Sequence, residues 1–386
     1  MKILFVINNY YSKGNGLSAS ARRTVGYLSK DGHEVRILSG ANQNQSGPQP
    51  YYCLSEFRLP LFSGLVAAQG YSFAKSDDNI IRKAVQWADV VHIEEPFYIQ
   101  MRAVKIAEEL GVPCTATYHL HPENLTASVG MENWSFLNTA ILRVWRDFVF
   151  DRCSDVQCPT ENVRKRLEKN YFRAALHVIS NGIIPEEGYH TFHKPDEPFT
   201  VACIGRLSRE KDRFTLLEAM KYSRFAGQIQ LIFAGRGPME DAYKEEADKL
   251  FQKGLLTHRP IFVFCNREKL RLLARKSDLY IHCATIEVEG LSCLEALQQG
   301  AVPIIAEGTL TAASQFALDA RSCFPERDAK TLADRIDYWL GNDKEREKMV
   351  SAYIQSAKKY DINGSIAALE AMFQDAIHRK HSADIV

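Results

Sequence analysis

The stretch from residue 281 to residue 305, IHCATIEVEGLSCLEALQQGAVPII, constrains the fold of this chain more than any other part. Its apolar run ending at His282 predicts a buried strand, and residues 302–305 predict the next one. Between them, residues 290–299 predict a helix, which Gly300 ends. A strand, a glycine turn and a helix start direct several backbone N–H groups and the positive end of the helix dipole at one point. The stretch therefore predicts a phosphate-binding site.

Two carboxylates flank this turn. Glu287 lies just before the predicted helix, and Glu295 lies more than one turn inside it. Such side chains do not grip a phosphate, but they accept hydrogen bonds from sugar hydroxyls. Taken alone the pair is weak evidence, because most acidic pairs of this kind are solvated helix charges. Beside a phosphate site, the pair indicates a nucleotide whose phosphate carries a sugar.

The order of residues here resembles the signature of a known family. Glu287-x7-Glu295, followed by Ala296-Leu297 and by GAVP at 300–303, is similar to the motif of the family 4 glycosyltransferases, also called glycosyltransferase group 1. In that family the first Glu contacts the donor sugar and the second holds the ribose hydroxyls, and the resemblance implies these roles here. Glu289 stands where the family usually has an aromatic residue.

A basic motif follows another predicted strand, Phe199–Ile204, in the sequence GRLSREK. Two cations five residues apart can converge on a diphosphate, Arg206 as a fork and Lys211 as a point charge. The family's GRLxxxK stretch binds the donor pyrophosphate, with a glycine next where this chain has Asp212. The resemblance therefore implies that Arg206 and Lys211 act in catalysis by stabilising the leaving diphosphate.

Further donor contacts are implied in glycine turns and at helix starts. The turn Gly-Asn-Gly at 14–16 follows a predicted strand, but its spacing is not that of the dinucleotide fingerprint, and the family has two adjacent glycines there. The loop that begins at Asn266 corresponds to the one where the family seats the base against backbone. The implied donor-binding residues are Gly14, Gly16, Arg206, Lys211, Gly235, Asn266, Glu287, Gly290, Leu291, Ser292 and Glu295.

A histidine marks the first half of the chain. His119 follows the predicted strand 112–117, at the carboxyl end where such sheets bind ligands. A histidine in this place is more often structural than catalytic, but the family often has one against the donor sugar. The resemblance thus makes His119 a catalytic candidate beside Arg206, Lys211 and Glu287. The surrounding TYHLHPENLT resembles bacterial members that glycosylate membrane lipids, including diacylglycerol glucosyltransferases, so His121, Glu123 and Asn124 are candidate polar contacts without assigned roles.

Length and the resemblance together predict the architecture. A chain of 386 residues is long for one core. We expect an α/β protein with two facing Rossmann-like, doubly wound domains (the GT-B fold) and a site in the cleft between them. The predicted domains are an acceptor-side domain at 1–182 and a nucleotide-sugar-binding domain at 183–365. A final helix at 366–386 is expected to cross back to the first domain.

Composition narrows the partners and the compartment. The formal charge of +1 gives no electrostatic reason to expect nucleic acid. The nine cysteines include no CxxC pair, which favours free thiols in a reducing compartment over disulfides or zinc. No apolar run is long enough for a signal peptide or a membrane span. We expect a cytoplasmic protein, with any membrane contact peripheral on the inner face of the cell membrane.

The resemblance implies a retaining transfer of a hexose from a nucleotide diphosphate sugar to a hydroxyl. The expected donor is UDP-glucose or UDP-galactose, and the expected acceptor is a membrane lipid such as diacylglycerol or a sphingolipid. No Asp-x-Asp stands in a suitable loop, and GT-B enzymes work without a metal ion, so we expect no metal and no cofactor. The alternatives are a transferase of capsule or lipopolysaccharide assembly with a sugar acceptor, a nucleotide-sugar epimerase, a phosphorylase and a non-catalytic sugar-binding module.

Two apolar segments bear on the acceptor. Residues 59–73, LPLFSGLVAAQGYSF, are either a packed loop with a short helix or part of an acceptor site. In the next segment, apolar residues at three- and four-residue steps form one helical stripe that holds two tryptophans. Packing of this helix on its own domain is the simpler interpretation, and docking onto a bilayer is the alternative. The stripe consists of Trp134, Leu137, Ile141, Trp145 and Phe148.

Overall fold

The computed structural model describes residues 1–12, 16–42, 47–57 and 73–384. The chain divides into two compact units, a first unit of Met1–Asn181 with Ile362–Val386 and a second unit of Gly182–Asp361. The final helix therefore begins at Ile362 rather than at 366. Its first residue is already buried in the hydrophobic core of the first unit, which explains the earlier start.

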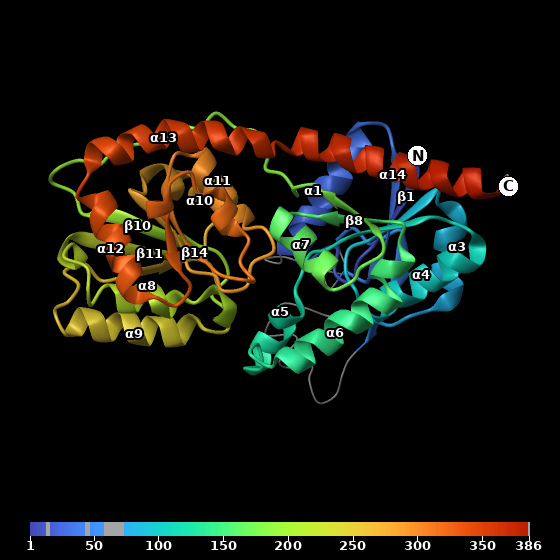
Figure 1. Ribbon diagram of the computed structural model, residues 1–386, viewed down its shortest axis with the longest axis horizontal. Helices are drawn as coiled ribbons and strands as arrows, with labels where there is room; N and C mark the ends of the chain where they lie inside the picture. Colours follow the sequence, from blue (N-terminus) through green and yellow to red (C-terminus); the bar gives the residue numbers. More distant parts are fainter. Residues whose placement is uncertain (13–15, 43–46, 58–72, 385–386) are drawn as a thin grey trace. The chain divides into compact units, whose positions relative to one another are not determined.

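The first unit is built on a parallel sheet of order β3-β2-β1-β6-β7-β8-β9 (Figure 1). The inner strands are buried on both faces, as expected where helices cover a parallel sheet. A separate antiparallel pair joins β4 to β5. The strands are β1 (Lys2–Val6), β2 (Glu34–Gly40), β3 (Tyr52–Leu54), β4 (Glu56–Phe57), β5 (Phe73–Ala74), β6 (Val90–Ile93), β7 (Cys114–Thr117), β8 (Asp155–Cys158) and β9 (Ala175–Val178).

Helices pack against this sheet. The last one, α14, shares a core with α1 and β1, and it is tied to the rest of the unit by an ion pair between His33 and Glu370 at 2.8 Å. A second ion pair joins Arg379 to Asp155 at the start of β8. The helices are α1 (Gly16–Lys30), α3 (Asp78–Trp87), α4 (Tyr98–Leu110), α5 (Pro122–Thr126), α6 (Ser135–Phe148), α7 (Glu161–Lys169) and α14 (Ile362–Asp384).

The second unit has a parallel sheet of order β12-β11-β10-β13-β14-β15, with α8 and α9 on one side and α10 and α11 on the other (Figure 1). Its strands are β10 (Phe199–Ile204), β11 (Ile229–Ala234), β12 (Ile261–Val263), β13 (Leu279–His282), β14 (Val302–Glu307) and β15 (Cys323–Pro325). Its helices are α8 (Arg213–Ala219), α9 (Glu240–Gln252), α10 (Arg267–Lys276), α11 (Leu291–Gln298), α12 (Ala329–Leu340) and α13 (Asp343–Ala357). The predicted α/β, doubly wound fold is confirmed for each unit.

The predicted apolar stripe on α6 is wrong in part. Trp145 is only 4% exposed, whereas Trp134 and Phe148 are 60% and 51% exposed. The helix instead buries the face that holds Asn138, Leu142 and Trp145.

A polar residue causes this difference. Asn138 is drawn inward because its side chain accepts a hydrogen bond from Thr126 Oγ1 at 2.8 Å and donates one to the Glu132 carbonyl at 2.8 Å. The buried face of the helix is therefore turned toward this residue. The periodicity of apolar residues alone cannot show such a rotation of the helix about its own axis.

Two further expectations can be compared with the described residues. All nine cysteines are free thiols. None of the helices that the structure describes has the length and the apolar character needed to span a bilayer.

Candidate active site

The centre of the second sheet provides the first part of the site. β10 lies between β11 and β13, so the strand order runs outward from it in both directions. Ligands of open α/β sheets bind at such a switch point, beyond the carboxyl ends of the strands. The residue that follows β10 is Gly205, whose φ of +135° is a conformation that favours glycine. The turn that carries Arg206 therefore starts at the expected place.

Close backbone packing holds this turn. The Gly205 N–H donates to the Ala234 carbonyl at 2.9 Å, and the Leu207 N–H donates to the Arg236 carbonyl at 3.0 Å. A Cβ at Gly235 would lie 1.9 Å from the Gly205 oxygen, so only glycine fits there. The structure thus explains Gly235 as the support of the turn, and its predicted contact with the donor stays a prediction.

Arg206 lies in the turn as a cation without a partner. Its side chain is half-buried, and within the described parts of the chain no carboxylate lies at ion-pair distance from it. Burial lowers the pKa of Arg206, and the charge of Glu210 acts in the opposite direction. Because a half-buried guanidinium without a partner is unfavourable, Arg206 is suited to an anion that arrives with the substrate.

Lys211, by contrast, is already paired. Its Nζ lies 2.5 Å from Glu287 Oε2, and the same oxygen lies 3.2 Å from Nε2 of the buried His282. Burial would raise the pKa of Glu287, but the charge of Lys211 and the close contact with the His282 ring outweigh it and hold that pKa well below its usual range. Glu287 is therefore an ionised acceptor, as a contact to sugar hydroxyls requires.

The start of α11 is built for close approach. Gly290 has a φ of +95°, and a Cβ there would lie 2.9 Å from the Ala313 Cβ. The first N–H groups of the helix, at Leu291 and Ser292, have no acceptor within the helix. Ser292 Oγ lies 3.9 Å from the place that a Cβ at Gly205 would occupy. The glycine turn after β10 and the start of α11 thus lie side by side.

Two predicted donor residues lie further along this unit. Glu295 is partly exposed on α11, and its Oε1 lies 3.4 Å from Nη2 of Arg267. Asn266 precedes Arg267 and caps α10, because its side chain accepts a hydrogen bond from the Lys269 N–H at 3.0 Å. The Asn266 side chain therefore stabilises the start of α10, and the backbone of Asn266 remains available for the predicted contact with the nucleotide base. Arg267, the partner of Glu295, was not predicted.

The first unit holds the remaining candidates. Gly16 is the first residue of α1, whereas Gly14 lies outside the described residues, as do residues 58–72 of the apolar segment. His119 Nε2 lies 2.7 Å from Oε2 of the buried Glu94. Burial acts to raise the pKa of Glu94, but His119 outweighs it and the pKa lies below its usual value.

Glu94 escaped the sequence analysis. It follows β6 directly, while His119 lies just beyond the neighbouring strand β7. Two adjacent acidic residues at the end of a buried strand are the sequence signal that could have identified Glu94 as a site residue. The carboxylate orients the ring of His119, because it accepts a hydrogen bond from one nitrogen and leaves the other for a ligand.

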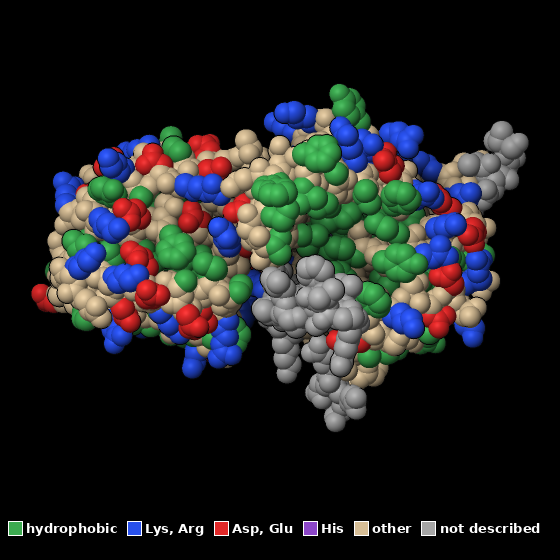
Figure 2. All heavy atoms as spheres, turned by 90° about the horizontal axis from the view of Figure 1, so that it is seen from below, with side chains coloured by type: hydrophobic (Ala, Val, Ile, Leu, Met, Phe, Trp, Pro, Cys, Tyr) green, Lys and Arg blue, Asp and Glu red, His purple; other side chains and the backbone are tan. Residues whose placement is uncertain are grey.

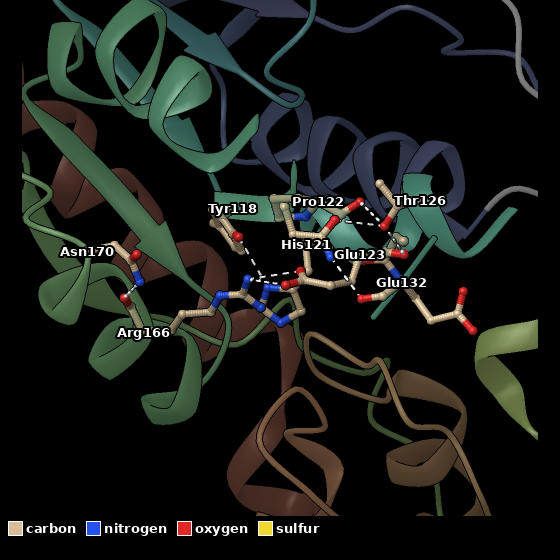
Figure 3. A network of polar contacts seen from close by, with 10 residues as sticks. Tyr118, His121, Pro122, Glu123, Thr126, Glu132, Arg166 and Asn170 are labelled. Atoms are coloured by element: carbon tan, nitrogen blue, oxygen red, sulfur yellow. Dashed lines mark hydrogen bonds and ion pairs between the residues drawn. The ribbon is translucent and has the colours of Figure 1, made fainter. Parts of the chain in front are cut away.

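The other polar residues near His119 serve the fold (Figure 3). The ring of His121 is fully buried, with its Nδ1 3.1 Å from the Tyr118 hydroxyl. Glu123 accepts two hydrogen bonds from Arg166, at 2.8 Å and 2.9 Å, and Asn124 accepts one from the His121 N–H at 2.7 Å. These contacts give all three candidates a structural explanation.

The described residues contain no group of three or more His, Cys, Asp or Glu side chains that could hold a metal ion. The structure thus brings together the turn at Gly205, the start of α11 and the cluster of Lys211, Glu287 and His282 in the second unit. His119 and Gly16 belong to the first unit.

Comparison with known proteins adds the following. Residues 14–187 match the family model described as Glycosyltransferase Family 4, and residues 190–356 match the one described as Glycosyl transferases group 1. The alpha-monoglucosyldiacylglycerol synthase of Streptococcus pneumoniae is 25% identical over 325 residues, which are 80% of this chain and 71% of that protein. The phosphatidyl-myo-inositol mannosyltransferase of Mycobacterium leprae is 25% identical over 386 residues, covering 94% of this chain and 93% of that protein.

A solved structure with a similar fold is that of Anabaena Alr3699/HepE in complex with UDP. It has a TM-score of 0.73 and an identity of 18%, and the match covers 97% of this chain and all of that one. At this identity the likeness concerns the fold.

Proposed function

Because the chain is a GT-B glycosyltransferase of family 4, we propose that it transfers a hexose from UDP-glucose or UDP-galactose to a lipid hydroxyl, with retention of the anomeric configuration. The observation that carries the proposal is the site at Gly205. There the half-buried Arg206, which has no ion-pair partner in the described part of the chain, lies in a glycine turn that adjoins the start of α11. Such a site suits the diphosphate of a nucleotide sugar. The acceptor is a membrane lipid such as diacylglycerol or a sphingolipid, in line with the lipids that the names of two relatives contain.

The chemistry follows from the charges at the site. The bond between the anomeric carbon and the diphosphate oxygen breaks while the acceptor hydroxyl oxygen bonds to that carbon on the same face. The hydroxyl proton passes to the leaving diphosphate, on which negative charge develops as the bond breaks. Arg206, Lys211 and the N–H groups at the start of α11 stabilise that charge. The ionised Glu287 accepts hydrogen bonds from the hydroxyls of the transferred sugar. For His119, which Glu94 orients, a contact with the donor sugar stays a prediction. No metal ion is needed for these steps.

An assay of UDP release tests the function. The purified chain is incubated with UDP-glucose, UDP-galactose, UDP-GlcNAc or GDP-mannose, with diacylglycerol, ceramide or a soluble sugar as acceptor. We expect UDP to be released from a UDP-hexose only when a lipid is present, and we expect EDTA to leave the rate of release unchanged. NMR of the product should show an α-linked glycolipid. Release without any acceptor would indicate an epimerase, and none at all a binding module. Transfer to the soluble sugar alone, or a strict need for Mg²⁺ or Mn²⁺, would contradict the proposal.

The two glutamates should differ in what they bind. Replacing Glu295 by alanine should weaken the binding of UDP itself by roughly 1–3 kcal/mol, because the ribose hydroxyls lose their hydrogen-bond acceptor. Replacing Glu287 by alanine should weaken the binding of UDP-glucose more than the binding of UDP. The substitution removes a contact with the sugar, and it frees Lys211 to pair with the diphosphate of either ligand. Isothermal calorimetry with both ligands measures the difference. Glu240→Ala is the control, since Glu240 pairs with Lys244 on the same helix, α9, and with no other cation of the described residues. Both variants binding UDP as the wild type does would remove the ribose role.

Membrane contact of the first unit is a further part of the proposal. Figure 2 shows apolar side chains gathered on the face that carries α5 and α6. On α6 and at its start, Phe136 is 88% exposed, and Trp134 and Phe148 are more than half exposed. The exposed Arg143 lies on the same helix and suits anionic headgroups. We therefore propose that α6 docks on the inner face of the cell membrane, where a lipid acceptor resides.

Flotation with anionic vesicles tests this contact. The wild type should float with the vesicles at low salt and lose binding in ~0.5 M salt, where charges are largely screened. The double variant Trp134→Ser, Phe136→Ser should stay unbound yet remain folded, because both side chains are exposed. Leu272→Ser, an exposed apolar residue of the second unit, is the matched control and should float normally. A wild type that ignores the vesicles would show that the apolar face of α6 has another role.

A further inference from the structure

Arg213, the first residue of α8, is a buried cation that the site described above does not use. Its side chain is 0% exposed. Its one hydrogen bond runs from Nη2 to the Ile204 carbonyl at 3.4 Å, and its Nε and Nη1 have no partner among the described residues. No carboxylate of the described chain lies at ion-pair distance from it. An arginine keeps its charge in proteins, and burial of an unpaired charge is costly.

The groups around Arg213 do not neutralise it. Cys203, Cys283 and Tyr280 lie close enough to affect it electrostatically. Burial raises the pKa of each of these three groups, so all of them are neutral at neutral pH. The interior of this unit therefore holds a positive charge with no carboxylate at ion-pair distance in the described chain, while the carboxylate of the preceding residue, Asp212, acts on Cys203 and Cys283 in the same region.

This charge lies directly beneath the proposed diphosphate site. A Cβ at Gly205 would lie 3.2 Å from Arg213 Nη2 and 3.9 Å from Ser292 Oγ. The hydroxyl of Tyr280 links the end of β10 to the start of α11, because it lies 3.3 Å from the Ile204 carbonyl and 3.1 Å from Ser292 Oγ. Arg213 thus supports the turn at Gly205 from inside, next to the start of α11.

The charges of the site can now be compared. Glu287 offsets Lys211, whereas Arg206 in the turn and Arg213 beneath it have no carboxylate partner among the residues that the structure describes. Two uncompensated cations on the two sides of one glycine turn match the charge of a diphosphate group. A buried charge also acts over a few ångströms with little screening, since the protein interior has a low dielectric constant.

We infer that Arg213 is the buried counter-charge for the diphosphate of the donor, acting electrostatically through the turn at Gly205 rather than by contact. This inference rests on the proposed function and adds a positioning residue to it. The free protein carries an unfavourable buried charge, and binding of a diphosphate relieves it. Arg213 should therefore lower the stability of the free protein and raise its affinity for the ligand.

The test combines stability with binding in the full chain. Arg213→Met keeps the length of the side chain and removes its charge. We expect its melting temperature without ligand to equal or exceed that of the wild type. We also expect at least about tenfold weaker binding of UDP, a change of about 1.4 kcal/mol, with unchanged binding of uridine, which has no phosphate. Arg213→Lys, which keeps the charge, should retain most of the affinity for UDP.

A second buried arginine provides the control. Arg346 is 5% exposed but paired, with Nη2 2.9 Å from Asp343 and 3.5 Å from Asp278. Arg346→Met should lower the melting temperature and leave the affinity for UDP unchanged. A large loss of stability or a failure to fold in Arg213→Met would show that the arginine is structural and would overturn the inference. So would equal loss of UDP and uridine binding, or UDP binding like that of the wild type.

Inorganic pyrophosphate and a wider set of nucleotide diphosphates separate this inference from the proposed function. Inorganic pyrophosphate should bind more weakly to Arg213→Met than to the wild type, which would assign the effect to the diphosphate itself. A wild type that binds neither UDP nor any other nucleotide diphosphate would contradict the proposed function. Binding to the wild type with no change in Arg213→Met would contradict the inference alone.

Discussion

Replacing Lys211 by alanine is expected to lower turnover by about 100-fold or more at saturating donor, because the leaving diphosphate loses a fixed positive charge in the transition state. Arg206→Ala should have an effect of similar size. The measurement is the steady-state rate with UDP-glucose and a lipid acceptor, with donor concentration varied to separate kcat from KM. Lys221→Ala, which removes an exposed cation of the same unit, should leave both constants unchanged.

The two variants should nevertheless differ in binding. Arg206 has no partner in the described chain, so its loss should raise the KM for the donor in addition to lowering kcat. Loss of Lys211 also removes the main charge that holds the pKa of Glu287 low, so the fall in kcat of this variant should become steeper as pH decreases. Turnover at the wild-type level in either variant would exclude that residue from stabilisation of the leaving group.

The central part of the site could be predicted because its determinants are local in sequence. The strand, the glycine and the helix between residues 279 and 298 each have their own signal, and the structure places β13, Gly290 and α11 there. Gly290 occupies a left-handed conformation that favours glycine. Arg206 and Lys211 likewise follow one strand within a single short motif.

The part of the site that the sequence does not predict depends on contacts between segments that lie far apart in the chain. Glu94 and His119 are joined only because β6 and β7 are neighbours in the sheet. His282 was recognised as the end of a strand, but its contact with Glu287 depends on the path of the loop before α11. No pattern in the sequence marks Arg213, since an arginine in the first turn of a helix is usually solvated. Whether it is buried depends on how α8 packs beneath the turn.

The free energy of unfolding is expected to fall as pH decreases from 6.5 to 4, and His92 should be a main cause. This histidine lies in β6, fully buried, with its Nδ1 and Nε2 each 2.9 Å from a hydroxyl, of Thr115 and Thr117. Burial, assisted by the charge of His119 and opposed by Glu94, lowers its pKa from 6.5 to about 4. Folding therefore holds this ring neutral.

The sign of the effect follows from this shift. Between pH 6.5 and pH 4 the unfolded chain binds a proton at His92 that the folded chain does not bind, so acid favours unfolding in this window. Above pH 6.5 both states are neutral and the contribution is constant. A shift of this size corresponds to roughly 3 kcal/mol, reached in full near pH 4. His190, whose pKa burial also lowers to about 4, adds to the acid sensitivity in the same direction.

Denaturant unfolding at several pH values, followed by tryptophan fluorescence, measures this contribution. Trp87, Trp134 and Trp145 lie in the same unit as His92, so the signal reports mainly on that unit. His92→Asn should be less stable than the wild type near neutral pH, because the amide cannot reach both threonines as the ring does. It should also lose less stability on acidification, by roughly 3 kcal/mol near pH 4. Parallel pH profiles for the two proteins would show that His92 is protonated equally in both states, contrary to its burial between β6 and the threonines of β7.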